Sequence, residues 1–84
     1  MLESRDFIKL NDGNTYAVIS STKDNNKLYY YIMDIHNKDN YKFCYEEKNN
    51  DTLILVEENN TEQLKRLVRL FASNLRKEIK ILEE

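Results

Sequence analysis

The sequence predicts an α+β fold, in which a four- to five-stranded antiparallel β-meander is followed by one long C-terminal amphipathic helix. Up to Val56 the apolar residues come in short runs that Asn, Asp and Gly separate, as in short strands joined by turns. From Glu62 onward they recur every three or four residues without Gly or Pro, which is the period of a helix. Eighty-four residues indicate a single domain over 1–84, with the meander at 5–57 as a curved sheet or partial barrel and the helix at 61–82.

The first two strands are expected at residues 5–10 and 15–22. Between them, residues 11–14 contain the only glycine, and an Asp-Gly pair between apolar runs favours a type I′ hairpin turn, whose backbone needs positive φ angles. The second strand is rich in β-branched residues, which favour extended backbone. Residues 23–26 form the next turn, and the Asn-Asn pair there tolerates left-handed angles.

The third strand, residues 28–35, is expected at the centre of the sheet because both of its faces are largely apolar. Residues 36–40 form a polar turn, and residues 41–47 alternate as a half-buried strand does. A turn at 49–51 leads to the fifth strand at 52–57. The connections are short, so each strand is expected to pair antiparallel with the next one.

The helix begins at a cap formed by Asn60 or Thr61, and Gln63 lies at the position that completes a capping box with Asn60. One apolar stripe about 120° wide is expected to cover the sheet. The stripe consists of Leu64, Leu67, Val68, Phe71, Leu75, Ile79 and Leu82.

Composition narrows the class of protein. The chain has one cysteine, which excludes an internal disulfide. It also has only one histidine, and one cysteine and one histidine are too few for a His/Cys zinc site. A core this small favours stabilisation by a partner subunit. The chain shows no membrane-length apolar run and no signal-peptide pattern, so a cytoplasmic location is expected. Heavy use of Asn, Lys, Ile and Tyr without Pro or Trp is typical of a low-GC bacterium or its phage.

No catalytic motif is present in the sequence, so we expect a protein without enzymatic activity, cofactor or metal. His36 is interpreted as a solvated turn residue, and Cys44 as a structural thiol in a strand. The tyrosines of neighbouring strands are interpreted as structural cross-strand pairs, with a stacking or binding surface as the alternative wherever a ring faces water.

Charge and helical periodicity suggest a partner-binding surface on the helix. Residues 1–60 hold seven basic and eleven acidic residues, whereas residues 61–84 hold six basic and four acidic ones. Leu70 and Ile81 lie off the apolar stripe and, being eleven residues apart, share one flank. The alternatives are an ordinary solvated face and a contact surface. The candidate partner-binding residues are Leu70, Ile81, Arg66, Arg69, Arg76, Lys77 and Lys80.

Three segments carry a resemblance to a known family: residues 10–14 (LNDGN), residues 27–33 (KLYYYIM) and residues 53–58 (LILVEE). With their order of strands, turn and helix, they resemble the YrzB-like family of small, acidic, uncharacterised Firmicutes proteins over roughly residues 7–71. The resemblance implies a small bacterial protein and adds no catalytic residue.

We therefore expect a small non-enzymatic module that docks on a protein partner, in the first place as a homodimer. The alternative is a nucleic-acid-binding module that uses the basic helix face together with the sheet tyrosines. The overall net charge of −2 weighs against that alternative, because the acidic sheet would repel a polyanion.

Overall fold

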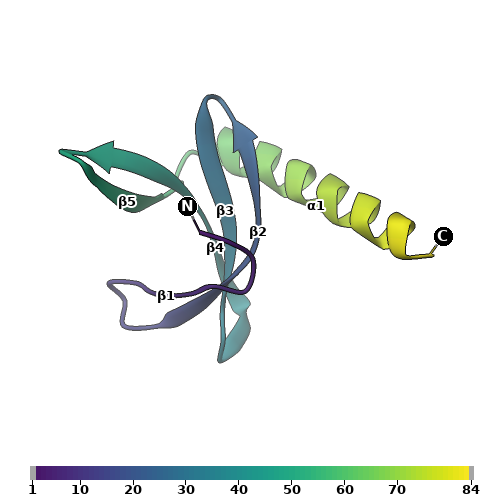
Figure 1. Cartoon of the computed structure of the whole chain (residues 1–84), viewed down its shortest axis with the longest axis horizontal. Helices are drawn as coiled ribbons and strands as arrows, with labels where there is room; N and C mark the ends of the chain where they lie inside the picture. The colour runs from purple at the N-terminus through teal and green to yellow at the C-terminus, as the bar shows by residue number, and fades with distance from the viewer. Residues whose placement is uncertain (1, 84) are drawn as a thin grey trace.

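The computed structural model describes the backbone of residues 2–83 and the side chains of residues 2–74. Five strands precede one helix along the chain (Figure 1). They are β1 (Phe7–Lys9), β2 (Thr15–Asp24), β3 (Lys27–Asp34), β4 (Asn37–Asn49), β5 (Thr52–Glu57) and α1 (Thr61–Glu83).

The strands form one sheet in chain order, β1-β2-β3-β4-β5, and every neighbouring pair is antiparallel. The sheet curls into a half-barrel, with α1 on its convex side and an opening between β1 and β5 on its concave side (Figure 1). The predicted α+β class and antiparallel meander are confirmed, with five strands and a partial rather than a closed barrel.

Asparagine builds two of the tight turns, as the sequence predicts. Asn25 and Asn26 connect β2 to β3 with φ angles of 51° and 62°, and Asn50 and Asp51 connect β4 to β5 with φ angles of 50° and 70°. Two consecutive left-handed residues define a type I′ turn, whose twist matches the flanking strands.

The Asp-Gly hairpin has a different turn from the predicted type I′. Only Gly13 has a positive φ, of 85°, and its N–H donates to the carbonyl of Leu10 at 3.0 Å. Asp12 has a negative φ angle. Its carboxylate accepts hydrogen bonds from the N–H of Asn14 at 2.9 Å and from the hydroxyl of Tyr16 at 2.5 Å, which hold the residue in this conformation. These bonds favour a longer loop with the glycine at its end.

The predicted polar turn at residues 36–40 is shorter than expected. β4 already begins at Asn37, opposite Asp34, and the next paired residues are Met33 and Tyr41. Residues 38–40 therefore bulge out of the ladder. The bulge directs the amide of Asn40 to the Tyr16 hydroxyl at 3.0 Å and to the Asp34 carboxylate at 3.1 Å.

Each face of the sheet carries its own apolar cluster, and β3 is the central strand, as predicted. The concave cluster consists of Tyr16, Val18, Tyr30, Ile32 and Cys44. The convex cluster joins Tyr29 and Phe43 of the sheet to Leu67 and Phe71 of the helix, with Phe43 and Phe71 stacked at a centroid distance of 5.5 Å.

The helix begins as predicted, with Asn60 as its cap. The side-chain oxygen of Asn60 accepts from the N–H of Gln63 at 2.9 Å, and its carbonyl accepts from the N–H of Leu64 at 2.9 Å. The predicted capping box differs, because the Gln63 side chain donates to Asp24 at 2.8 Å instead of returning to Asn60. Of the described stripe, Leu67 and Phe71 are buried and Leu64 is half-buried, whereas Val68 is 51% exposed and lies outside the core.

Candidate docking surfaces

The predicted basic face of α1 is partly committed to holding the helix on the sheet. The Nε and Nη2 atoms of Arg66 donate hydrogen bonds to the two carboxylate oxygens of Asp24, at 2.9 Å each. The hydrogen bonds from Arg66 and then Gln63 hold the pKa of Asp24 below its usual range. Asn25 donates to Gln63 at 3.2 Å, so the β2–β3 hairpin and the first helical turns form one polar contact. Arg66 thus has a structural role that the helical pattern does not reveal.

Arg69 and Leu70 lie together on the flank that the sequence indicates. They line a shallow hollow of about 280 Å³ with Glu62, Lys65 and Arg66, and Leu70 is half-buried there. The side chains of Arg76, Lys77, Lys80 and Ile81 lie outside the described residues, so the pairing of Leu70 with Ile81 stays a prediction.

A larger apolar surface lies on the convex side, where α1 does not cover the sheet. The strand register places Phe7 opposite Ala17, Ala17 opposite Met33, and Met33 opposite Tyr41. Directly opposed residues share one face of a sheet, so these four form a single row across four strands. Phe7 is 69% exposed and Tyr41 51% exposed, so the row is open to solvent at both ends.

Three further side chains extend this row into a patch. Ile19 and Ile35 line a hollow of about 400 Å³ together with Ala17 and Met33. Val68 of the helix lines a second hollow, of about 190 Å³, next to Tyr41. We call this surface the convex patch; its members are Phe7, Ala17, Ile19, Met33, Ile35, Tyr41 and Val68.

Sequence reasoning missed the convex patch because it assumed that the helix would cover the whole sheet. The alternation of Met33 with Ile35, and of Tyr41 with Phe43, did indicate the shared face. The register that places Tyr41 opposite Met33 depends on the bulge at residues 38–40, and no local pattern predicts that bulge.

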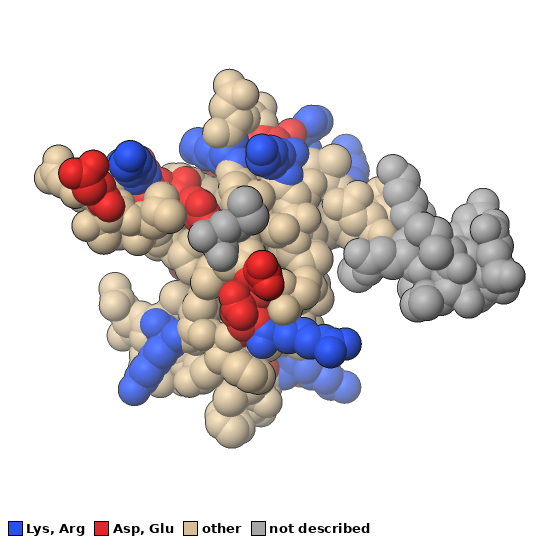
Figure 2. All heavy atoms as spheres, in the orientation of Figure 1, with Lys and Arg blue, Asp and Glu red and all other residues tan. Residues whose placement is uncertain are grey.

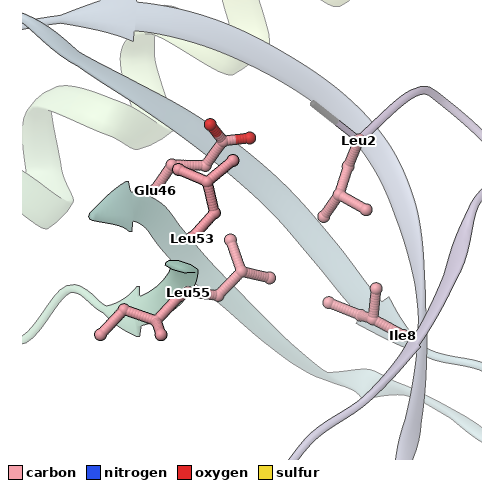
Figure 3. Close-up of a pocket in the computed structure, with 6 residues that line it drawn as sticks. Leu2, Ile8, Glu46, Leu53 and Leu55 are labelled. Carbon is pink, nitrogen blue, oxygen red and sulfur yellow. The ribbon is translucent and has the colours of Figure 1, made fainter. Parts of the chain in front are cut away.

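A third surface is the open mouth of the half-barrel. Leu2 and Ile8 lie on one side of it and Leu53 and Leu55 on the other (Figure 3). Ile54 also lines this cavity, which has a volume of about 240 Å³. The space-filling view shows the same indentation between the β4–β5 and β1–β2 hairpins, at the left of Figure 2.

Polar groups at the mouth are paired with one another. The hydroxyl of Tyr30 donates to the Glu46 carboxylate and accepts from the N–H of Leu2 at 3.0 Å. Burial, together with the hydrogen bond to Glu46, raises the pKa of Tyr30 to about 12, so its proton stays in place at neutral pH. Glu46 is therefore an acceptor fixed at the edge of the cavity.

The histidine and the cysteine of this chain are His36 and Cys44. Within residues 2–74 no group of three or more His, Cys, Asp or Glu side chains is arranged to hold a metal ion. His36 is exposed beside its turn, and burial raises the pKa of the Cys44 thiol to about 11, which keeps it protonated and unreactive at neutral pH. Both residues occupy the environments that the sequence predicts.

No family model, curated protein or solved structure matches this chain. The resemblance to the YrzB-like family therefore stays a prediction. Within the part of the chain that the structure describes, no helix is both long enough and apolar enough to cross a bilayer.

Proposed function

We propose that the chain is a non-enzymatic protein-interaction module that docks through its convex patch, and that its first partner is a second copy of itself. The observation that carries this proposal is the cross-strand row Phe7–Ala17–Met33–Tyr41, which is left uncovered beside the helix. A contiguous exposed apolar surface on a small soluble domain marks an interaction site.

The chemistry of the patch favours self-association. Its seven side chains carry no charge, and the two charged residues that also line its hollow, Asp34 and Lys38, are opposite in sign, so two copies could meet there without net repulsion although each chain has a net charge of −2. A twofold axis through the patch would place the same surface of both subunits in contact, as in most homodimers. The small core of an 84-residue chain would gain the additional apolar burial that it needs.

Light scattering on two matched variants tests this proposal. Ile35→Glu places a charge in the convex patch, at a side chain that is 46% exposed, and should convert the dimer to a monomer without unfolding it. Leu70→Glu places the same charge on the helix flank and should leave the dimer intact. Monomeric wild-type protein, or a dimer that only Leu70→Glu dissociates, would contradict the proposal.

Nucleic-acid binding is a second candidate, which the exposed basic side chains of α1 favour. The side chains of Lys65 and Arg66 are 64% and 59% exposed, and Arg69 is exposed beside them. Binding through phosphate contacts would weaken steeply with salt and would fall in an Arg69→Ala variant. Failure of the wild-type chain to bind single- or double-stranded nucleic acid at low salt removes this candidate.

A further inference from the structure

Among the described residues, β5 pairs only with β4 and presents a free hydrogen-bonding edge on its other side. Its pairing with β4 begins at Thr52 opposite Asn49, beside the two-residue turn, and ends where the N–H of Glu58 donates to the carbonyl of Phe43 at 2.9 Å. Hydrogen-bonded pairs alternate along an antiparallel ladder, so Thr52, Ile54 and Val56 use their backbone groups toward β4. The N–H and C=O groups of Leu53, Leu55 and Glu57 consequently point away from the sheet.

This edge has few of the features that prevent strand addition. β5 contains six residues and no proline, whereas β1, the opposite edge, has three residues. Leu53 is 57% exposed and Ile54 39% exposed. The one charged side chain of β5, Glu57, is engaged by Lys42 at 3.0 Å on the β4 side. The edge is therefore apolar and accessible.

The cavity at the mouth lies beside this edge and fits the side chains of an added strand. Its walls come from β5 on one side and from Leu2 and Ile8 on the other (Figure 3). A strand laid along β5 would direct every second side chain into the concave side, toward Leu53, Leu55 and the cavity. Those inward side chains would need to be apolar.

The charges around the edge select a basic segment. Between Lys42 and Glu58 the chain carries two lysines and five acidic residues, namely Glu46, Glu47, Asp51, Glu57 and Glu58. Glu46 and Glu57 already accept from Tyr30 and Lys42 on the cavity side. Glu47 pairs with Ile54 and so lies on the opposite face, where the second set of side chains of an added strand would point. A second copy of β5 in this position would bring the same carboxylates against these, which disfavours self-addition.

We propose that β5 binds an extended segment of another protein as a sixth strand, and that this segment alternates aliphatic residues with lysine or arginine. The inference extends the proposed role as a protein-interaction module, but it uses the edge of the sheet instead of the convex patch. Main-chain hydrogen bonds would provide affinity, and the cavity and carboxylates would provide specificity.

The experiment uses a fluorescent peptide of alternating valine and lysine, titrated by anisotropy into the full chain carrying Ile35→Glu, so that dimerisation does not interfere. We expect saturable binding with amide chemical-shift changes centred on residues 53–57. A peptide in which glutamate replaces lysine should bind at least about tenfold more weakly. A lysine peptide whose backbone amides are N-methylated along one edge of the peptide strand should also bind at least about tenfold more weakly.

Two substitutions at Leu53 test the contribution of the β5 edge from the protein side. The N–H of Leu53 points away from β4, so Leu53→Pro removes an edge donor while the β4–β5 ladder remains. Leu53→Ala removes the side chain alone. We expect Leu53→Pro to weaken binding about tenfold beyond Leu53→Ala. Equal binding of both variants, or of the methylated peptide, would overturn strand addition.

The two proposals fail separately. Wild-type protein that is monomeric yet binds the lysine peptide at β5 would contradict docking through the convex patch and support the added strand. A dimer that the lysine peptide does not bind would overturn the added strand alone.

Discussion

The residues that define the interior of this protein are tyrosines, and each buried hydroxyl has a carboxylate acceptor. Tyr16 donates to Asp12, Tyr29 to Glu58 at 2.7 Å, and Tyr30 to Glu46. A phenol removed from water needs such an acceptor, and the contact with an anion reinforces the rise in the tyrosine pKa that burial produces. Asp12, Glu46 and Glu58 thus have a structural role as acceptors for buried hydroxyls.

At the residue scale, stability should depend on the ionised form of Asp34. The N–H of His36 donates to its carboxylate at 2.8 Å, and this bond, followed by that from Asn40, holds the pKa of Asp34 below its usual value of 3.8. A lowered folded-state pKa means that the stabilisation is complete above the unfolded value and is lost as pH falls through the folded value.

We therefore expect the urea midpoint to fall as pH decreases below about 4, and Asp34→Asn to reduce this decrease. The effect should be partial, because Asp12 and Asp24 also have lowered pKa values. Urea titrations of both proteins between pH about 6 and about 2 measure it. Parallel curves for the two proteins would show that Asp34 makes no such contribution.

Cys44 provides a second test at this scale. Its thiol is buried among the concave cluster, and burial raises its pKa to about 11. We expect maleimide labelling at pH about 8 to be negligible in the native state and rapid in denaturant, because the reactive species is the thiolate. Labelling of the native protein as fast as that of the unfolded chain would show that the concave side is open to solvent.

At the element scale, the sequence predicted the features that depend on local patterns, namely the strands, the asparagine turns and the helix cap. Five strands, the asparagine turns and the Asn60 cap are present as periodicity and turn chemistry predict, but β4 runs from Asn37 to Asn49 and is longer than the predicted 41–47. The differences arise where side chains compete with the local pattern. Asp12 changes the type of the first hairpin turn, and Gln63 leaves the capping box for Asp24. Those partners come from the tertiary arrangement, so a residue-by-residue pattern does not contain them.

The helix cap should have a measurable energetic effect. Asn60→Ala removes the acceptor for the N–H of Gln63 and should lower the free energy of unfolding by about 1 kcal/mol. Asn59→Ala changes the same residue type one position earlier and should have a much smaller effect. Chemical denaturation monitored by circular dichroism compares them, and equal losses would exclude a specific capping contribution.

At the scale of the whole molecule, the half-barrel and the placement of α1 determine which surfaces remain open. The described part of the helix packs on Tyr29 and Phe43 and leaves Met33 and Tyr41 uncovered. The sequence predicted the amphipathic stripe but not where it crosses the sheet, because a stripe specifies which helix face is buried and not the crossing position. The convex patch is open for that reason, and the helix flank stays a predicted contact surface.

The contrast between two neighbouring helix positions tests this placement. Phe71 is 2% exposed and stacks on Phe43, so Phe71→Ala should lower the free energy of unfolding by roughly 3 to 5 kcal/mol. Val68→Ala changes a half-exposed stripe residue and should cost less than about 1 kcal/mol. Thermal unfolding of both variants in an Ile35→Glu background resolves the two, and a reversed order would mean that the helix packs by another face.

Because the spatial order of the strands repeats their order along the chain, every strand pairs only with one that immediately precedes or follows it. Each pairing closes a short loop, so the entropy lost at any step is small and assembly should be fast for a β-rich protein. During synthesis, each new strand can pair with the preceding one as the chain leaves the ribosome. The helix arrives last, and until then the aromatic rings of Tyr29 and Phe43 stay exposed to chaperones and to neighbouring chains.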